Sequence, residues 1–165
     1  MPFVSTNPFK YTSLSPQRTR DLGLRLGAFL QPGDVVCLQG DLGAGKTTFV
    51  QGLAAGWGSI DAVSSPTFIL VNVYRGRDGG QLFHFDTYRV ESIPEAEELD
   101  LETMLASGPL VIEWAERMQN ILPADRLWIQ LEYLDENRRE ISFTASGARS
   151  EILLHEIQKS SFGSD

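Results

Sequence analysis

The first part of the chain alternates between amphipathic stretches and one wholly apolar stretch. After Ser15-Pro16, a pair typical of a helix N-terminus, apolar residues recur at helical spacing until Pro32-Gly33, and this predicts a first helix. Segment 34–39 has an unbroken apolar centre, which predicts a strand covered on both faces in a parallel sheet. Helical spacing returns over 49–54, and Gly56 and Gly58 predict the end of that helix.

The second part predicts two hairpins with a helix and a buried strand between them. The β-rich runs 68–74 and 81–86 flank a glycine-rich loop, and the alternating runs 127–133 and 139–145 flank a polar turn. Ser92 and Glu95 form a capping box for a helix that ends at Gly108-Pro109. We expect a buried strand over 110–114, a weakly helical segment over 149–159 and a frayed tail over 160–165.

Composition narrows the class of protein. The chain has 165 residues, which predicts one domain over residues 1–165, and its formal net charge of −8 disfavours direct binding to nucleic acid or to an anionic membrane. Cys37 is the only cysteine and lies in an apolar run, so we expect a buried side chain and no disulfide. We find neither a membrane-spanning run nor the pattern of a signal peptide, and we expect a cytoplasmic protein.

The strongest chemical signal is a phosphate-binding loop. Gly40 is followed after four residues by Gly45-Lys46-Thr47, between the apolar strand and the amphipathic helix, as a P-loop requires. Glycines let successive backbone N–H groups point at phosphates, and the following helix adds its N-terminal dipole. Lys46 is expected to reach the terminal phosphates, and Thr47 to bind Mg²⁺ through its hydroxyl. The sequence therefore predicts an α/β, P-loop NTPase-like domain whose mixed sheet has a parallel centre and antiparallel hairpins, with helices on both faces.

A P-loop site normally takes an acidic residue from the end of a neighbouring strand, and two residues compete for that role. Asp86 and Glu113 each end an apolar strand, where a carboxylate is costly to bury unless it meets a cation or hydrogen-bond donors. The residue pattern leaves open which of them binds Mg²⁺ directly. His84 has apolar neighbours, so a buried or surface role is favoured over a catalytic one, and Trp114 reads by itself as a packing residue.

The motifs of the chain are compatible with several nucleotide-dependent activities. The chain lacks the guanine-recognition and switch motifs of a Ras-type GTPase. A small-molecule P-loop kinase with Asp86 as base is the alternative to an ATPase, although Arg138 and Arg139 alone are a weak basis for a kinase lid. An adaptor that binds ATP as a structural ligand is a third hypothesis.

Further short motifs follow the loop in a specific order. The chain carries Gly40-Asp41-Leu42-Gly43-Ala44-Gly45-Lys46-Thr47-Thr48, then Ser65-Pro66-Thr67-Phe68, His84-Phe85-Asp86-Thr87-Tyr88-Arg89, Glu97-Glu98-Leu99, Ile112-Glu113-Trp114 and Ile121-Leu122-Pro123. The order and spacing of these motifs resemble those of the TsaE (YjeE) family of bacterial ATPases. The resemblance implies an ATPase of low intrinsic activity that binds ATP or ADP with Mg²⁺. It also implies partnership with TsaD and TsaB, while TsaC supplies the activated intermediate, in forming threonylcarbamoyladenosine beside the anticodon of tRNA, with tRNA contacted only through the complex.

The resemblance also implies a role for individual residues. Thr47 and Glu113 would hold Mg²⁺, and Asp86 would orient or polarise the attacking water. A switch segment, Ser65, Pro66 and Thr67, would sense the γ-phosphate. The adenine side would be flanked by the region near Ser15-Pro16 and by the turn near Asn137-Arg138. The residues expected to contact the nucleotide are Leu42, Gly43, Ala44, Gly45, Lys46, Thr47, Thr48, Trp114 and Arg138.

Overall fold

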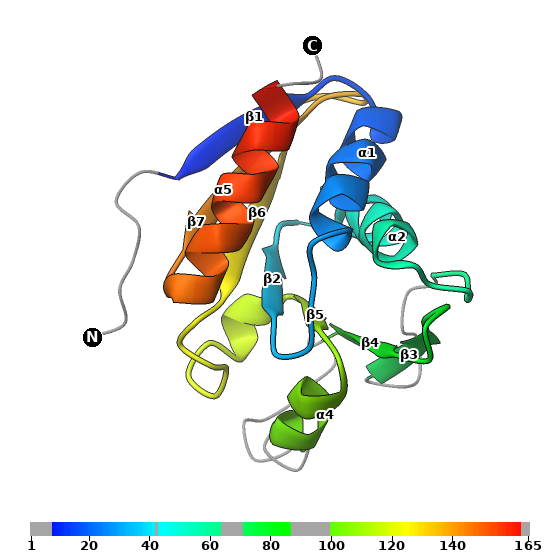
Figure 1. Cartoon of the computed structure of the whole chain (residues 1–165). Coiled ribbons are helices and arrows are strands. Elements are labelled where there is room, and N and C mark those ends of the chain that lie inside the picture. Colours follow the sequence, from blue (N-terminus) through cyan, green and yellow to red (C-terminus); the bar gives the residue numbers. More distant parts are fainter. Residues whose placement is uncertain (1–7, 42, 64–70, 87–99, 163–165) are drawn as a thin grey trace.

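A seven-stranded mixed sheet organises the residues that the computed structural model describes, which are 8–41, 43–63, 71–86 and 100–162 (Figure 1). Its strands lie in the order β1-β7-β6-β2-β5-β4-β3. The described strands are β1 (Phe9–Ser13), β2 (Val35–Gln39), β3 (Val71–Arg75), β4 (Gln81–Asp86), β5 (Leu110–Glu113), β6 (Leu127–Tyr133) and β7 (Arg139–Ala145). The described helices are α1 (Pro16–Gly27), α2 (Lys46–Trp57), α4 (Leu101–Ser107) and α5 (Ala148–Phe162), with a 3₁₀ turn, η2 (Ala115–Arg117).

The centre of the sheet is parallel and its two sides are antiparallel. β2 pairs in parallel with β5 and β6, and β5 pairs in parallel with β4. β3 with β4 and β6 with β7 form the two predicted antiparallel hairpins, and β1 adds to β7 at one edge. The predicted α/β architecture with a parallel centre is therefore confirmed.

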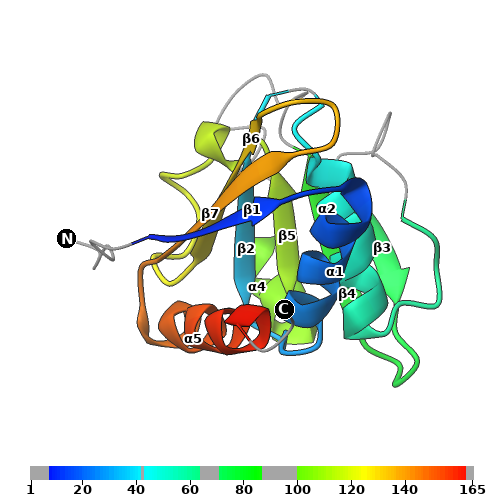
Figure 2. The same ribbon diagram turned by 90° about the horizontal axis from the view of Figure 1, so that it is seen from above.

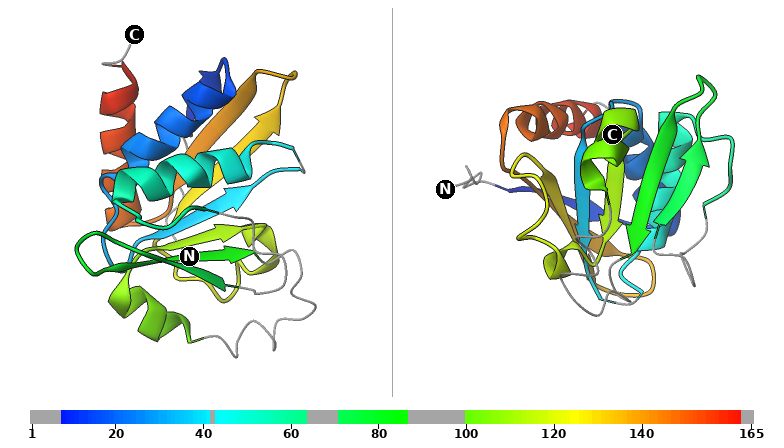
Figure 3. Two further views of the ribbon diagram at one scale, coloured as in Figure 1. Left: turned by 90° about the vertical axis from the view of Figure 1, so that its right-hand side faces the viewer. Right: turned by 90° about the horizontal axis from the view of Figure 1, so that it is seen from below.

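The side chains on the two faces of β2 belong to two separate hydrophobic clusters. Val36 and Leu38 pack on the side that carries α1, α2 and α5, whereas Val35 and Cys37 pack on the side of α4 and η2 (Figures 2 and 3). Side chains of a strand alternate between the faces, so a fully apolar strand needs cover on both. Helices lie on both faces as expected. Burial raises the pKa of the Cys37 thiol to about 12, although the charge of Arg126 opposes the shift, which fits the expected apolar role.

Close packing of α1 on α2 holds in place the helix that follows the predicted phosphate-binding loop. A side chain at Gly27 of α1 would overlap the carbonyl oxygen of Leu53, and one at Gly52 of α2 would overlap that of Arg20. Only glycine lets the two backbones approach this closely. α1 begins as predicted, with Pro16 at its first turn and the Ser15 side chain accepting from the N–H of Arg18 at 3.1 Å.

Two of the predicted helix boundaries need correction, and one strand needs to be added. The helix that carries Leu101 does not run continuously from Ser92, because Asp100 is its N-cap, with ψ 79, and accepts from the N–H of Thr103 at 3.2 Å. The expected capping box itself, Ser92 and Glu95, lies outside the described residues. α5 extends to Phe162, so fraying does not begin at residue 160. The strand β1 was not predicted.

No helix among the described ranges has the length and apolar character needed to cross a membrane.

Candidate nucleotide-binding site

The carboxyl ends of four parallel strands meet at one edge of the sheet. Asp86 of β4 is in register with Glu113 of β5, and Gln39 of β2 is in register with Gln130 of β6. The chain crosses this edge where β2 leads into α2, which is the place where open α/β sheets bind ligands. The sheet topology thus brings both predicted acidic residues beside the phosphate-binding loop.

Glycine geometry shapes the loop between β2 and α2. Gly45 has φ 100 and is the N-cap of α2, and Gly43 has φ 82. A Cβ atom on Gly40 would lie 2.6 Å from the carbonyl oxygen of Leu131. The loop therefore needs glycine for its left-handed turns and for its close approach to β6. Leu42, which was also expected to wrap the phosphates, lies outside the described residues.

Lys46 turns back over its own loop. Its side-chain Nζ donates to the carbonyl oxygen of Gly40 and, at 3.0 Å, to that of Asp41. The same atom lies 4.1 Å from the centroid of the Trp114 ring, which is a cation–π geometry. Trp114 directly follows β5 and has φ 61, a left-handed conformation that is uncommon for a residue other than glycine. The strained turn at Trp114 places its indole against the loop lysine.

Negative charge surrounds the Lys46 ammonium. The residue is only 6% exposed, and burial lowers its pKa below the usual value, while the carboxylates of Glu113, Glu116, Asp86 and Asp41 oppose this shift. A buried ammonium ringed by carboxylates is suited to a ligand that carries both phosphate groups and a divalent cation. One of the Glu116 carboxyl oxygens, Oε1, is buried with no hydrogen-bond partner in the described structure.

Most of the predicted site residues meet at this edge. Thr47 and Thr48 lie in the first turn of α2 directly after Lys46, and the partly buried Asp86 ends the neighbouring strand. The expected switch segment, Ser65, Pro66 and Thr67, lies outside the described residues. The described residues of the predicted site that share this edge are Gly43, Ala44, Gly45, Lys46, Thr47, Thr48, Asp86, Glu113 and Trp114.

Of the two arginines in the β6–β7 turn, Arg139 is the one that contacts the loop. Its Nη2 donates to the carbonyl oxygen of Gly43 at 3.1 Å, and its guanidinium carbon lies 4.6 Å from the centroid of the Tyr133 ring. Arg138, the expected nucleotide contact, pairs with Asp135 at 2.7 Å on the surface. Arg138 holds the pKa of that carboxyl near 2, chiefly by hydrogen bonding. The sequence shows only two adjacent arginines. Which of them contacts the loop depends on the register of the strands.

Hollows lined by described residues border the loop. A small one, of about 30 Å³, is lined by Pro16, Thr19, Gly45, Thr48, Asn137 and Arg139. It joins the start of α2 to the start of α1 and the β6–β7 turn, and the last two are the regions expected to flank the adenine side. A larger one, of about 380 Å³, opens on the other side of the loop and is lined by Gln39, Gly40, Asp41, Glu116, Gln130, Leu131, Glu132 and Tyr133.

His84 is buried, as one of the two roles favoured from its apolar sequence neighbours predicts, and it also contacts a predicted site residue. It is fully buried on β4, and its Nε2 lies 2.5 Å from Oε2 of Glu113. Its Nδ1 lies 2.8 Å from the hydroxyl of Tyr74 on β3. No spacing along the sequence reveals these contacts, because the partners come from different strands.

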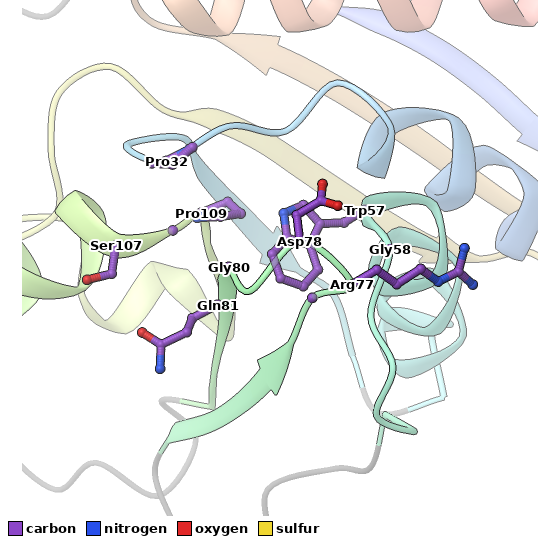
Figure 4. Close-up of a pocket in the computed structure, with 11 residues that line it drawn as sticks. Pro32, Trp57, Gly58, Arg77, Asp78, Gly80, Gln81, Ser107 and Pro109 are labelled. Carbon is purple, nitrogen blue, oxygen red and sulfur yellow. The ribbon is translucent and has the colours of Figure 1, made fainter.

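A further hollow, of about 340 Å³, lies at the opposite end of the parallel strands (Figure 4). Trp57 at the end of α2 forms one wall, and Pro32 and Pro109 precede β2 and β5. The charged residues at its rim, Arg77 and Asp78, are exposed. It therefore lacks the buried charge that marks the loop end of the sheet.

Comparison with known proteins finds similar proteins that match most of the chain. The family model described as "Threonylcarbamoyl adenosine biosynthesis protein TsaE" matches residues 13–141. The chain is 41% identical to a Bacillus subtilis protein named tRNA threonylcarbamoyladenosine biosynthesis protein TsaE, over 91% of this chain and 94% of that protein. It is 43% identical to a Treponema pallidum protein of the same name, over 79% of this chain and 96% of that protein. The crystal structure of YdiB from B. subtilis superimposes with a TM-score of 0.76 at 35% identity, covering 94% of this chain and 97% of that one.

Proposed function

The chain belongs to the TsaE family of threonylcarbamoyladenosine biosynthesis proteins, and from this premise we propose that it binds and hydrolyses MgATP as a switch. In this role it supports the TsaD–TsaB complex while threonylcarbamoyladenosine forms next to the anticodon of tRNA. The observation that carries the proposal is the position of Lys46, buried between a left-handed glycine loop and the carboxylates at the ends of β4 and β5.

The donor groups near Lys46 fit magnesium bound together with a nucleotide. Mg²⁺ prefers oxygen ligands, and the Thr47 hydroxyl and the Glu113 carboxylate supply them next to the loop. When bound, the cation would neutralise charge on the phosphate oxygens. Thr47 and Glu113 would hold it, and the backbone N–H groups of 43–48 with Lys46 would hold the phosphates.

Asp86 is assigned to the attacking water. Asp86 and Glu113 are neighbours in register on adjacent parallel strands, so one carboxylate can serve the cation while the other accepts a hydrogen bond from water. Lys46 then offsets negative charge on the transferred phosphoryl group. The Trp114 ring contacts the Lys46 ammonium, and the Arg139 guanidinium donates to the Gly43 carbonyl oxygen, so both residues support the loop.

The acidic balance of the chain agrees with indirect contact to tRNA. A net charge of −8 opposes association with a phosphodiester backbone. The phosphate contacts are therefore assigned to a partner, and this chain supplies the nucleotide-dependent step.

The experiment follows phosphate release from MgATP by the pure protein, alone and with the TsaD–TsaB pair. Stimulation by the pair is the expected result. Transfer of the phosphoryl group to a small metabolite would identify a kinase instead, and no release in any mixture would identify an adaptor that only binds ATP. Asp86→Ala should retain ATP binding and lose release, whereas Lys46→Ala should lose both.

A further inference from the structure

Three polar side chains form a chain of hydrogen bonds through the sheet. Tyr74 of β3, His84 of β4 and Glu113 of β5 come from three adjacent strands. They are 3%, 0% and 5% exposed, so water cannot replace the contacts among them. The series ends on the carboxylate that the proposed function assigns to Mg²⁺.

Strand alternation places the three residues on the α2 side of the sheet. Phe83 and Phe85, the neighbours of His84, pack in the cluster on the α4 side, as Ile112 does beside Glu113. Successive side chains point to opposite faces, so His84 and Glu113 share the face on which Tyr74 packs. This is also the face of α2, whose first residue is Lys46.

The contacts fix the direction of each hydrogen bond. A carboxylate has no hydrogen to donate, so the Nε2–H of His84 donates to Oε2 of Glu113. In a neutral imidazole the Nδ1 atom is then an acceptor, and the Tyr74 hydroxyl donates to it. The Glu113 carboxylate thereby selects the imidazole tautomer, and the Tyr74 hydroxyl holds the ring from its other nitrogen.

Stability alone gives a weak reason for this arrangement. Buried polar groups are costly to desolvate, and well-packed apolar replacements are often equally stable. The surrounding positions of both strands are apolar, from Leu82 to Phe85 apart from His84, and from Leu110 to Ile112. The three hydrogen-bonded residues instead lead to the end of the strands at which the phosphate-binding loop lies.

We propose that Tyr74 and His84 are positioning residues that hold the Glu113 carboxylate in the orientation in which it binds Mg²⁺ with the nucleotide. The inference rests on the proposed function. Hydrogen-bond partners behind a metal ligand fix its orientation, and their loss typically weakens metal affinity about 10- to 100-fold. Neither residue needs to contact the nucleotide itself.

The test measures how much Mg²⁺ is needed for half-maximal tightening of a fluorescent ATP analogue. His84→Leu should raise this Mg²⁺ midpoint about tenfold or more, and Tyr74→Phe should raise it less, because the histidine remains. His84→Gln keeps an N–H donor at the same depth and should stay within about threefold of the wild type. Affinity for the analogue in EDTA should change little in all three variants, since the loop itself is unaltered.

Trp128→Phe is the matched control. It removes another cross-strand side-chain bond near the same edge, from the indole N–H to Oε1 of Gln39 at 2.8 Å, without touching Glu113. It should leave the Mg²⁺ midpoint unchanged. Thermal unfolding of each variant separates loss of the fold from loss of positioning, and Tyr74→Phe still tests the inference if His84→Leu does not fold.

The outcomes distinguish the inference from the proposed function. A wild-type protein with no Mg²⁺-dependent tightening would overturn both. A normal wild-type response together with unchanged midpoints in folded His84→Leu and Tyr74→Phe would overturn the positioning role alone. Equal losses in His84→Gln and His84→Leu would also contradict it, because the donor would then not matter.

Discussion

The Nζ atom of Lys46 lies 4.1 Å from the centroid of the Trp114 ring. The same ammonium donates to the Gly40 and Asp41 carbonyl oxygens, so groups of the protein satisfy part of its hydrogen bonding. Phosphate oxygens would compete for these interactions, because charge-assisted hydrogen bonds are stronger than those to neutral carbonyls. Binding at the loop should therefore change the surroundings of one particular indole.

Tryptophan fluorescence should report this change. MgATP should alter the emission of the wild type and of Trp57→Phe, whose indole lies at the far end of α2 (Figure 4). The response should disappear in Trp114→Phe, although phenylalanine keeps an aromatic face for Lys46. A full response in Trp114→Phe would place the nucleotide away from the Lys46–Trp114 contact.

The glycine at the start of α2 is predicted to matter for more than stability. Gly45→Ala and Gly79→Ala both introduce a side chain at positive φ, 100 and 83 respectively, and each should lower the free energy of unfolding by ~1 kcal/mol. Only Gly45→Ala should also weaken ATP binding, about tenfold or more, because it displaces the N–H groups that face the phosphates. Urea unfolding and nucleotide titration measure the two effects. Equal ATP affinity in both variants would contradict the loop assignment.

The sequence predicted the elements whose patterns are long and locally consistent. The apolar strand β2, both hairpins and the Ser15 cap of α1 were all found. Strand β1 is short and exposed on one side, so its pattern was too weak to detect. The start of α4 was wrong for a different reason. Asp100 and Thr103 form the cap in the structure, and a similar signal at Ser92 and Glu95 competes with them in the sequence.

The residues of the candidate site that belong to recognisable sequence motifs could be predicted. The glycine loop, Lys46, Asp86 and Glu113 all follow from residue type and from their place at strand ends. Contacts between side chains of different strands cannot be predicted in this way, because they depend on the register of the strands. His84 meets Glu113 from 29 residues away, and Arg139 meets Gly43 from 96 residues away.

Arg139 and Arg138 should differ in their effect on the nucleotide. Arg139→Ala removes the donor to the Gly43 carbonyl oxygen and the cover over Tyr133, so the loop should lose order and ATP should bind about tenfold more weakly. Arg138→Ala breaks only an exposed ion pair with Asp135, which contributes little. Isothermal titration of both variants decides between them. A larger loss in Arg138→Ala would restore the expectation drawn from the sequence.

Acid should destabilise the protein partly through Asp125. Burial raises the pKa of this carboxyl, but hydrogen bonds with Ser150 and the N–H of Arg149 outweigh it, so the net pKa is lowered. A lowered pKa in the folded state stabilises the fold above the unfolded value of about 3.9, and this stabilisation is lost as pH falls through the folded value. Asp125→Ala should cost ~1 kcal/mol at pH 7 and less at pH 3. Equal costs in urea unfolding at the two pH values would contradict this origin.

Calorimetric titration with ATP and Mg²⁺ tests most directly whether the loop around Lys46 grips a nucleotide. The wild type should release or absorb heat with one saturable site, and Lys46→Ala, folded to the same extent by thermal unfolding, should give none, because the buried ammonium that faces the phosphates is gone. An identical isotherm for the two proteins, or no heat from the wild type at millimolar nucleotide, would contradict the account.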